Sequence, residues 1–243
     1  MLVLILSLIL QAALVVHVIK TGRNQIWIWA IVLLPLAGPI AYIAVEIIPG
    51  LFRSRAAQRT ARGLKKALDP TAQLRRYEQE TRVAGNVASR QRYAEELTRH
   101  GRHEEAVGQY REALTGLYEH DPNLLLGLAQ AQFAQGDAPA ARATLDALIA
   151  QNPEFRSPAG HLLYARALAA EGNTAKALEE YAVLAPSYPG AEAAARYAQR
   201  LKSQGQTAAA QQVARELLER ARIAPAHYRR AQREWLEAAR KLL

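Results

Sequence analysis

The chain has 243 residues, a formal net charge of +9 and no cysteine. A chain without cysteine has no disulfide, no cysteine-ligated zinc, no iron–sulfur cluster and no thiol nucleophile. The charge is uneven: residues 1–87 contain 11 Lys and Arg against 4 Asp and Glu, whereas residues 88–243 contain 20 against 18. Because the long C-terminal part has almost no basic excess, we expect no nucleic-acid-binding domain in it.

Two apolar segments, residues 2–19 and 26–48, begin the chain and are separated by the polar sequence KTGRNQ. A helix of about 20 apolar residues crosses a bilayer, and each segment is near this length. The short connection predicts a hairpin of two antiparallel transmembrane helices in residues 1–50. A cleaved signal peptide is the alternative for the first segment, although the segment lacks a charged start and a small-residue cleavage site.

Residues 51–86 are predicted to form a basic, helical, juxtamembrane linker. A cluster of six basic residues precedes the linker's first acidic residue, Asp69. The positive-inside rule places this cluster in the cytoplasm, so we expect a multi-pass protein of a bacterial inner membrane with both termini cytoplasmic; the reversed topology is the alternative. The cluster is also a candidate contact for anionic lipid headgroups, unless it is a topology signal alone. Its members are Arg53, Arg55, Arg59, Arg62, Lys65 and Lys66.

The second apolar segment carries a distinctive pattern of tryptophan, proline, glycine and tyrosine: Trp29, then Pro35, Gly38-Pro39 and Tyr42. This pattern resembles the N-terminal membrane hairpin of cardiolipin synthases and related phospholipase D-type proteins. The resemblance covers about residues 1–48 and implies a shared membrane module. It does not imply shared chemistry, because none of the six histidines is followed two residues later by the lysine of the family's catalytic signature.

The rest of the chain repeats with a period set by four glycines, Gly101, Gly136, Gly172 and Gly205, which are 35, 36 and 33 residues apart. An alanine stands seven residues before each glycine and another stands five residues after it. These alanines are Ala94, Ala129, Ala165 and Ala198, and Ala106, Ala141, Ala177 and Ala210. Glycine permits a sharp turn between two helices, and the alanines let the helices pack closely.

This pattern resembles the tetratricopeptide repeat (TPR), so the expected fold is all-α: the two-helix transmembrane hairpin, then an α-solenoid of about four helix pairs in residues 87–225. In the first pair we expect the second helix to extend through residues 113–122. Residues 226–243 are predicted to form one helix that caps the solenoid. Its apolar face would carry Tyr228, Ala231, Trp235, Ala238 and Leu242.

The TPR resemblance also implies a function, because arrays of this family bind peptides or partner proteins in a groove lined by the first helix of each pair. The family's groove positions correspond here to Gln91, Glu95, Asn123, Leu126, Gln130, Phe133, Leu162, Arg166, Gln199 and Lys202. Phe133 is the strongest candidate, because a large apolar side chain on a solvent-facing surface marks an interaction site. A solvated helix face is the alternative for the others.

The sequence contains no catalytic motif: a Gly-x-Ser-x-Gly, a P-loop and a Gly-x-Gly-x-x-Gly are all missing. His100 and His103 lack a third ligand, so we expect no metal, no cofactor and no enzymatic activity. The sequence therefore predicts a membrane-tethered scaffold or adaptor that binds partner proteins or peptides. The alternative is a non-catalytic regulator or lipid-binding accessory of envelope phospholipid metabolism.

Overall fold

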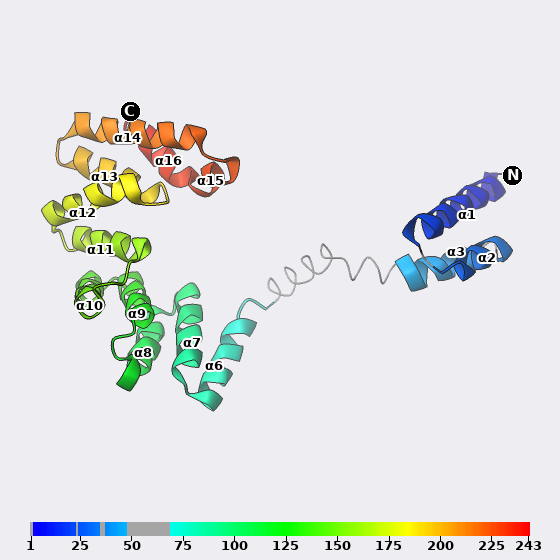
Figure 1. Ribbon diagram of the computed structural model, residues 1–243, viewed down its shortest axis with the longest axis horizontal. Helices are drawn as coiled ribbons and strands as arrows, with labels where there is room; N and C mark the ends of the chain where they lie inside the picture. Colours follow the sequence, from blue (N-terminus) through cyan, green and yellow to red (C-terminus); the bar gives the residue numbers. More distant parts are fainter. Residues whose placement is uncertain (1, 23, 35–36, 48–68) are drawn as a thin grey trace. The chain divides into compact units, whose positions relative to one another are not determined.

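A computed structural model describes residues 2–22, 24–34, 37–47 and 69–243. All regular elements within these ranges are helical, which confirms the all-α prediction. The chain divides into two compact units, with the boundary at residues 72 and 73. We describe each unit by itself (Figure 1).

The N-terminal unit consists of α1 (Leu2–Thr21), α2 (Ile26–Leu33), α3 (Ala37–Tyr42) and the π-helix η1 (Ile43–Ile47). Gly22, at φ +62°, makes the turn that follows α1, because this backbone conformation is strained for other residues. Leu14 and Val18 of α1 pack against Ile31 and Tyr42, so α1 and the second segment form a small core.

The second apolar segment is not the single helix that its composition predicted. It is divided into α2, α3 and η1, and the first break falls at Leu34, which leaves the helical conformation with φ −121° and ψ 86°. Leu34 precedes Pro35 in the sequence, and a residue before proline disfavours the helical region. Gly38 is tightly packed here, since a Cβ atom on it would lie 2.1 Å from the carbonyl oxygen of Ala30.

Within the described ranges, no helix combines the length and the apolar character that crossing a membrane requires. Neither predicted membrane span is thus found among these residues.

The second unit begins with α6, a helix that lies within the predicted linker and packs on the solenoid. Its elements are α6 (Ala72–Ala84), α7 (Val87–Arg99), α8 (His103–Ala113), the 3₁₀ turn η2 (Gly116–Tyr118), α9 (Pro122–Gln135), α10 (Ala138–Gln151), α11 (Pro158–Ala170), α12 (Thr174–Ser187), α13 (Glu192–Ser203), α14 (Thr207–Ile223), α15 (Ala226–Ala231) and α16 (Arg233–Arg240). From α7 to α14, each helix packs against the next one in the chain (Figure 1).

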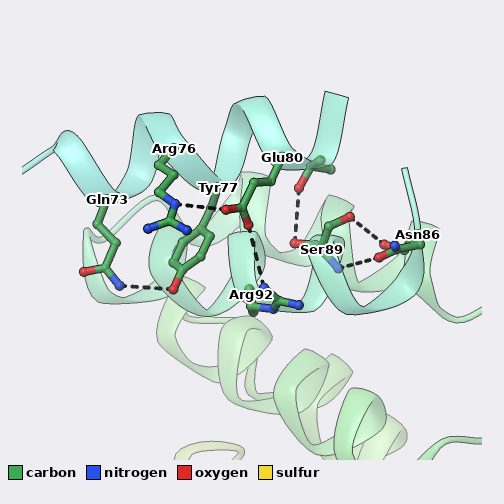
Figure 2. Close-up of polar contacts among 8 residues, drawn as sticks. Gln73, Arg76, Tyr77, Glu80, Asn86, Ser89 and Arg92 are labelled. Atoms are coloured by element: carbon green, nitrogen blue, oxygen red, sulfur yellow. Dashed lines mark hydrogen bonds and ion pairs between the residues drawn. The ribbon is translucent and has the colours of Figure 1, made fainter. Parts of the chain in front are cut away.

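Polar contacts join α6 to the first repeat (Figure 2). The hydroxyl of Thr81 donates to the carbonyl oxygen of Ser89 at 3.1 Å, and Glu80 lies 3.7 Å from Arg92. Asn86 caps α7, because its side chain accepts a hydrogen bond from the backbone N–H of Ser89 at 2.9 Å. Leu74 of α6 is buried in the core of the first repeat, so α6 adds a helix to the solenoid.

The four glycines make the turns between the paired helices, as predicted from their spacing. All four have positive φ angles, between +75° and +96°, and they connect α7 to α8, α9 to α10, α11 to α12 and α13 to α14. The eight alanines of the repeat pattern are all 0% exposed. Four successive helix pairs are therefore confirmed, with the small residues at the helix crossings.

Two local predictions are wrong. The second helix of the first pair does not extend through residues 113–122: α8 ends at Ala113, and Gly116, at φ +56°, lies in the turn that follows. The C-terminal segment is not one helix, because Gln232 separates α15 from α16 with φ −99° and ψ 12°. The amide oxygen of Gln232 accepts a hydrogen bond from the backbone N–H of Ala191 at 2.9 Å. Ala231, the last residue of α15, is exposed and does not belong to the predicted apolar face.

Candidate partner-binding groove

The residues predicted to line a groove lie on the first helices of the four pairs, but their environments differ. Most keep some solvent exposure and are free to meet a partner. The exposed ones are Asn123, Gln130, Gln199 and Lys202, and the half-buried ones are Gln91, Glu95, Leu126, Phe133 and Arg166. Leu162 is only 4% exposed and packs in the core between α11 and α12, so it does not form part of an open surface.

Two of the predicted residues meet across neighbouring repeats. The guanidinium of Arg166, on α11, lies over the ring of Phe133, on α9, at 4.8 Å from the ring centroid. An arginine in this position is attracted to the aromatic face by about 0.5–1 kcal/mol at an exposed site. The Phe133 side chain is half-buried, and the guanidinium of Arg166 covers one face of its ring.

The contact continues onto α13. A side-chain nitrogen of Arg166 lies 3.7 Å from Glu192, close enough for an ion pair and too far for a hydrogen bond. Glu192 instead accepts a hydrogen bond from Arg196 at 2.8 Å. The guanidinium of Arg196 lies over the ring of Trp235, on α16, at 4.6 Å from its centroid.

These five side chains form a continuous row across α9, α11, α13 and α16, which we call the arginine–aromatic row: Phe133, Arg166, Glu192, Arg196 and Trp235. It has an aromatic ring at each end, two arginines and one carboxylate. Because one carboxylate serves two guanidinium groups, the row has a net charge of +1. Arginine presents five N–H donors, so the row keeps donors for a carboxylate or a backbone carbonyl of a partner.

Sequence reasoning did not place Glu192, Arg196 or Trp235 in the groove, and it expected Trp235 only on the apolar face of the capping helix. Glu192 stands at the second position of its repeat, where the family pattern places a groove residue, so the repeat register was the signal available for it. Trp235 is the only tryptophan after residue 29. Its stacking on Arg196 depends on how the C-terminal helices fold back, which no local pattern encodes.

The remaining predicted sites behave differently. Arg53, Arg55, Arg59, Arg62, Lys65 and Lys66 lie outside the described residues. His100 lies 3.3 Å from Glu96, one turn earlier in the chain. In the part of the chain that the structure describes, no group of three potential ligands is arranged to hold a metal ion.

Comparisons with known proteins agree with the repeat architecture. Residues 97–161 match the family model described as "Tetratricopeptide repeat". The MamA protein structure aligns with a TM-score of 0.54 and 18% identity, over 68% of this chain and 92% of that one. A thermophilic TPR protein from Thermus thermophilus aligns with a TM-score of 0.52 and 18% identity, over 73% of this chain and 96% of that one. No curated protein matches the chain.

At these identities the structural similarity shows the fold alone. The family match over residues 97–161 and the observed helix pairs together support a TPR-like array within an all-α solenoid.

Proposed function

We propose that this chain is a non-catalytic scaffold whose TPR array binds a partner protein or peptide through the arginine–aromatic row. The observation that carries the proposal is the alignment of Phe133, Arg166, Arg196 and Trp235 across successive repeats. Arginine, tryptophan and other aromatic residues supply much of the binding energy at protein interfaces. Here they come from helices far apart in the sequence and form one surface.

The row is also organised before a partner arrives. The side chain of Arg166 is 34% exposed and that of Arg196 is 29% exposed, and each is held between a carboxylate and an aromatic ring. A side chain that is already ordered loses less conformational entropy on binding, and this cost is about 0.5–1.5 kcal/mol for each rotamer-rich side chain. The row therefore favours a partner that presents a carboxylate or carbonyl oxygen next to an apolar group.

Replacing Phe133 with alanine is expected to reduce binding, because the substitution removes both the aromatic surface and the support for Arg166. We expect recovery of a specific partner in crosslinked pull-downs with the intact chain to fall by about tenfold, as for a hot-spot residue worth about 1.4 kcal/mol or more. A matched control is Leu117→Ala, which removes an exposed apolar side chain from η2, outside the row.

The pull-down separates binding by the row from other causes. Loss of the same partner with Phe133→Ala, and its retention with Leu117→Ala, supports the proposal. Equal recovery with both variants, or no specific partner with the unmodified chain, contradicts it. Circular dichroism of the Phe133→Ala variant checks that the helix content is unchanged.

We also propose that the scaffold is held at a membrane by its N-terminal unit, in the bacterial inner membrane and with the repeats in the cytoplasm. The support is an unusual surface: this small unit leaves large apolar side chains exposed, including Trp29 at 68%. Others that are at least 60% exposed are Leu8, Ile9, Ile19, Ile26, Leu33 and Ile40. Contiguous exposed apolar surface is costly in water and marks a protein or membrane contact.

Cell fractionation tests the membrane proposal. We expect the full chain to sediment with the inner membrane and to dissolve in detergent, because the exposed apolar side chains of the N-terminal unit prefer a lipid environment. A chain that lacks residues 1–50 is expected in the supernatant. Recovery of the full chain in the supernatant contradicts the membrane location. A reporter fused after Leu243 tests the orientation: if it is active only on the outer side of the membrane, the repeats are not in the cytoplasm.

A role as a regulator or lipid-binding accessory of phospholipid metabolism rests on the sequence motif of the N-terminal unit alone. Among the described contacts of that unit, none favours this role over a plain anchor.

A further inference from the structure

A cavity of about 700 Å³ opens between the second and third repeats. Its walls come from α9, α10, the loop after α10, α11 and α12. Ligand pockets in proteins have volumes of about 300–1,000 Å³ and are mostly apolar, with a few polar groups. The apolar walls here include Leu126, Leu148, Phe155, Leu184 and Tyr188. The cavity shares no lining residue with the arginine–aromatic row.

The polar groups of the cavity are dominated by two carboxylates. Glu180, on α12, lies 2.6 Å from the Nε2 atom of His161, on α11. Asp146, on α10, lies 2.7 Å from Arg142. Burial, and secondly the neighbouring Asp146, raise the pKa of Tyr164. Both carboxylates are partly exposed to the cavity, with side chains 33% and 44% accessible.

The charges around the cavity do not cancel. Arg142 is shared between Asp146 and Glu171, since it lies 2.9 Å from Glu171 as well. Arg156 donates to the backbone carbonyl of Pro153. Around the cavity, the two guanidinium groups of Arg142 and Arg156 therefore stand against three carboxylates, those of Asp146, Glu171 and Glu180. A carboxylate has about four acceptor positions, so Glu180 retains acceptor capacity beyond its contact with His161.

The rim of the cavity adds information on the size of its occupant. Ile149 lines the cavity and is 55% exposed at its edge. A small free amine inside the cavity would leave this side chain in water, whereas an extended peptide that continues past the rim would cover it. Apolar walls, an exposed isoleucine at the rim and a surplus carboxylate match one type of occupant.

We propose that this cavity binds a segment of a partner protein in which aliphatic side chains flank a lysine. The aliphatic side chains fill the apolar walls and cover Ile149, and the lysine ammonium pairs with Glu180. The inference rests on the proposed protein-binding function, and it assigns part of the partner to a second surface beside the arginine–aromatic row.

Fluorescence anisotropy with the purified full chain tests this assignment. The probe is the fluorescein-labelled peptide Gly-Ser-Leu-Leu-Lys-Leu-Leu-Ser-Gly. We expect saturable binding. A peptide with glutamate in place of lysine should bind about tenfold more weakly or less, because it places like charges together. A peptide with serine in place of the four leucines should lose binding, because it cannot fill the apolar walls.

Three variants locate the binding. Ala150→Trp puts a large ring into the cavity from an exposed position of α10, and it should abolish binding. Glu180→Gln removes the charge and keeps the shape of the side chain. It should lower the affinity for the lysine peptide about fivefold and should not lower the affinity for the glutamate peptide. Ala208→Trp is the matched control, because Ala208 is exposed on α14 and outside the cavity. It should bind as the unmodified chain does.

The outcomes separate this inference from the proposed function. Equal affinity for the lysine and glutamate peptides, or unchanged binding by Ala150→Trp, overturns the inference. Displacement of the peptide by hexylamine at the peptide's own affinity also overturns it, in favour of a free amine. Partner capture that depends on Phe133, with no peptide binding, refutes the cavity assignment alone and leaves the row's function intact.

Discussion

Replacing Tyr181 with alanine is expected to lower the free energy of unfolding of the repeat array by about 3–5 kcal/mol, the range for removing a large aromatic side chain from a core. Tyr181, on α12, is 1% exposed. It packs among Leu162, Leu168 and Leu184, and Ala193 of the next repeat belongs to the same cluster. The substitution leaves a cavity at the contact between two repeats, where the stability of a solenoid depends on neighbouring units.

The measurement is urea unfolding followed by circular dichroism at 222 nm, a wavelength that reports helix content. Tyr118→Ala is the control, since Tyr118 lies in the 3₁₀ turn η2 and is largely exposed. Its effect should stay within about 0.5 kcal/mol, as for other surface substitutions. Similar effects of the two substitutions would contradict the packing described here.

Replacing Leu236 with alanine is expected to cost about 2–5 kcal/mol and to loosen the C-terminal end selectively. Leu236, on α16, is 2% exposed and packs on the cluster that contains Ala198, Leu217 and Ala221 of α13 and α14. A terminal helix of a solenoid covers the apolar face of the last repeat. Loss of this packing should also make Trp235 less ordered, because Trp235 precedes Leu236 in α16. Trp235 is the end of the arginine–aromatic row.

Hydrogen–deuterium exchange measures this effect helix by helix. We expect faster exchange in α13, α14 and α16 and unchanged exchange in α7 and α8, because contacts in a solenoid extend mainly to neighbouring units. The control is Glu234→Ala, at an exposed position of the same helix. Uniform acceleration along the whole array, or no acceleration in α14, would show that α16 does not act as a cap.

The sequence predicted the repeats well because their determinants are local and recur. Gly136 must adopt a left-handed conformation to connect α9 to α10, and Ala129 and Ala141 must be small where these helices cross. Each requirement recurs at the same spacing in the other pairs. A pattern of backbone and size constraints within one period of the repeat can be read from the chain alone.

Local signals also explain the errors. The apolar composition of residues 26–48 predicted one helix, but Leu34 stands before a proline and the helix ends there. Likewise, the late position of Pro122 suggested a second helix that extends through residues 113–122, whereas the structure places Gly116 in a left-handed turn. In both cases a single residue with a backbone constraint ended the helix.

The candidate sites depended on contacts that no local pattern contains. Phe133 could be singled out from the repeat register, but its partner Arg166 lies in the next repeat, and Trp235 reaches Arg196 only because α16 folds back on α13. The cavity beside Glu180 likewise needs walls from four helices and a loop. None of its lining residues is unusual in its own segment.

By itself the sequence determined that the chain is all-α and contains four helix pairs, because glycine turns and alanine crossings act through residues close together in the chain. Only the tertiary structure decided that Leu162 is buried and that Arg166 and Arg196 stack on aromatic rings. The physical reason is distance along the chain. Burial and side-chain stacking depend on which helix faces pack together, and that packing is set by the repeat array as a whole.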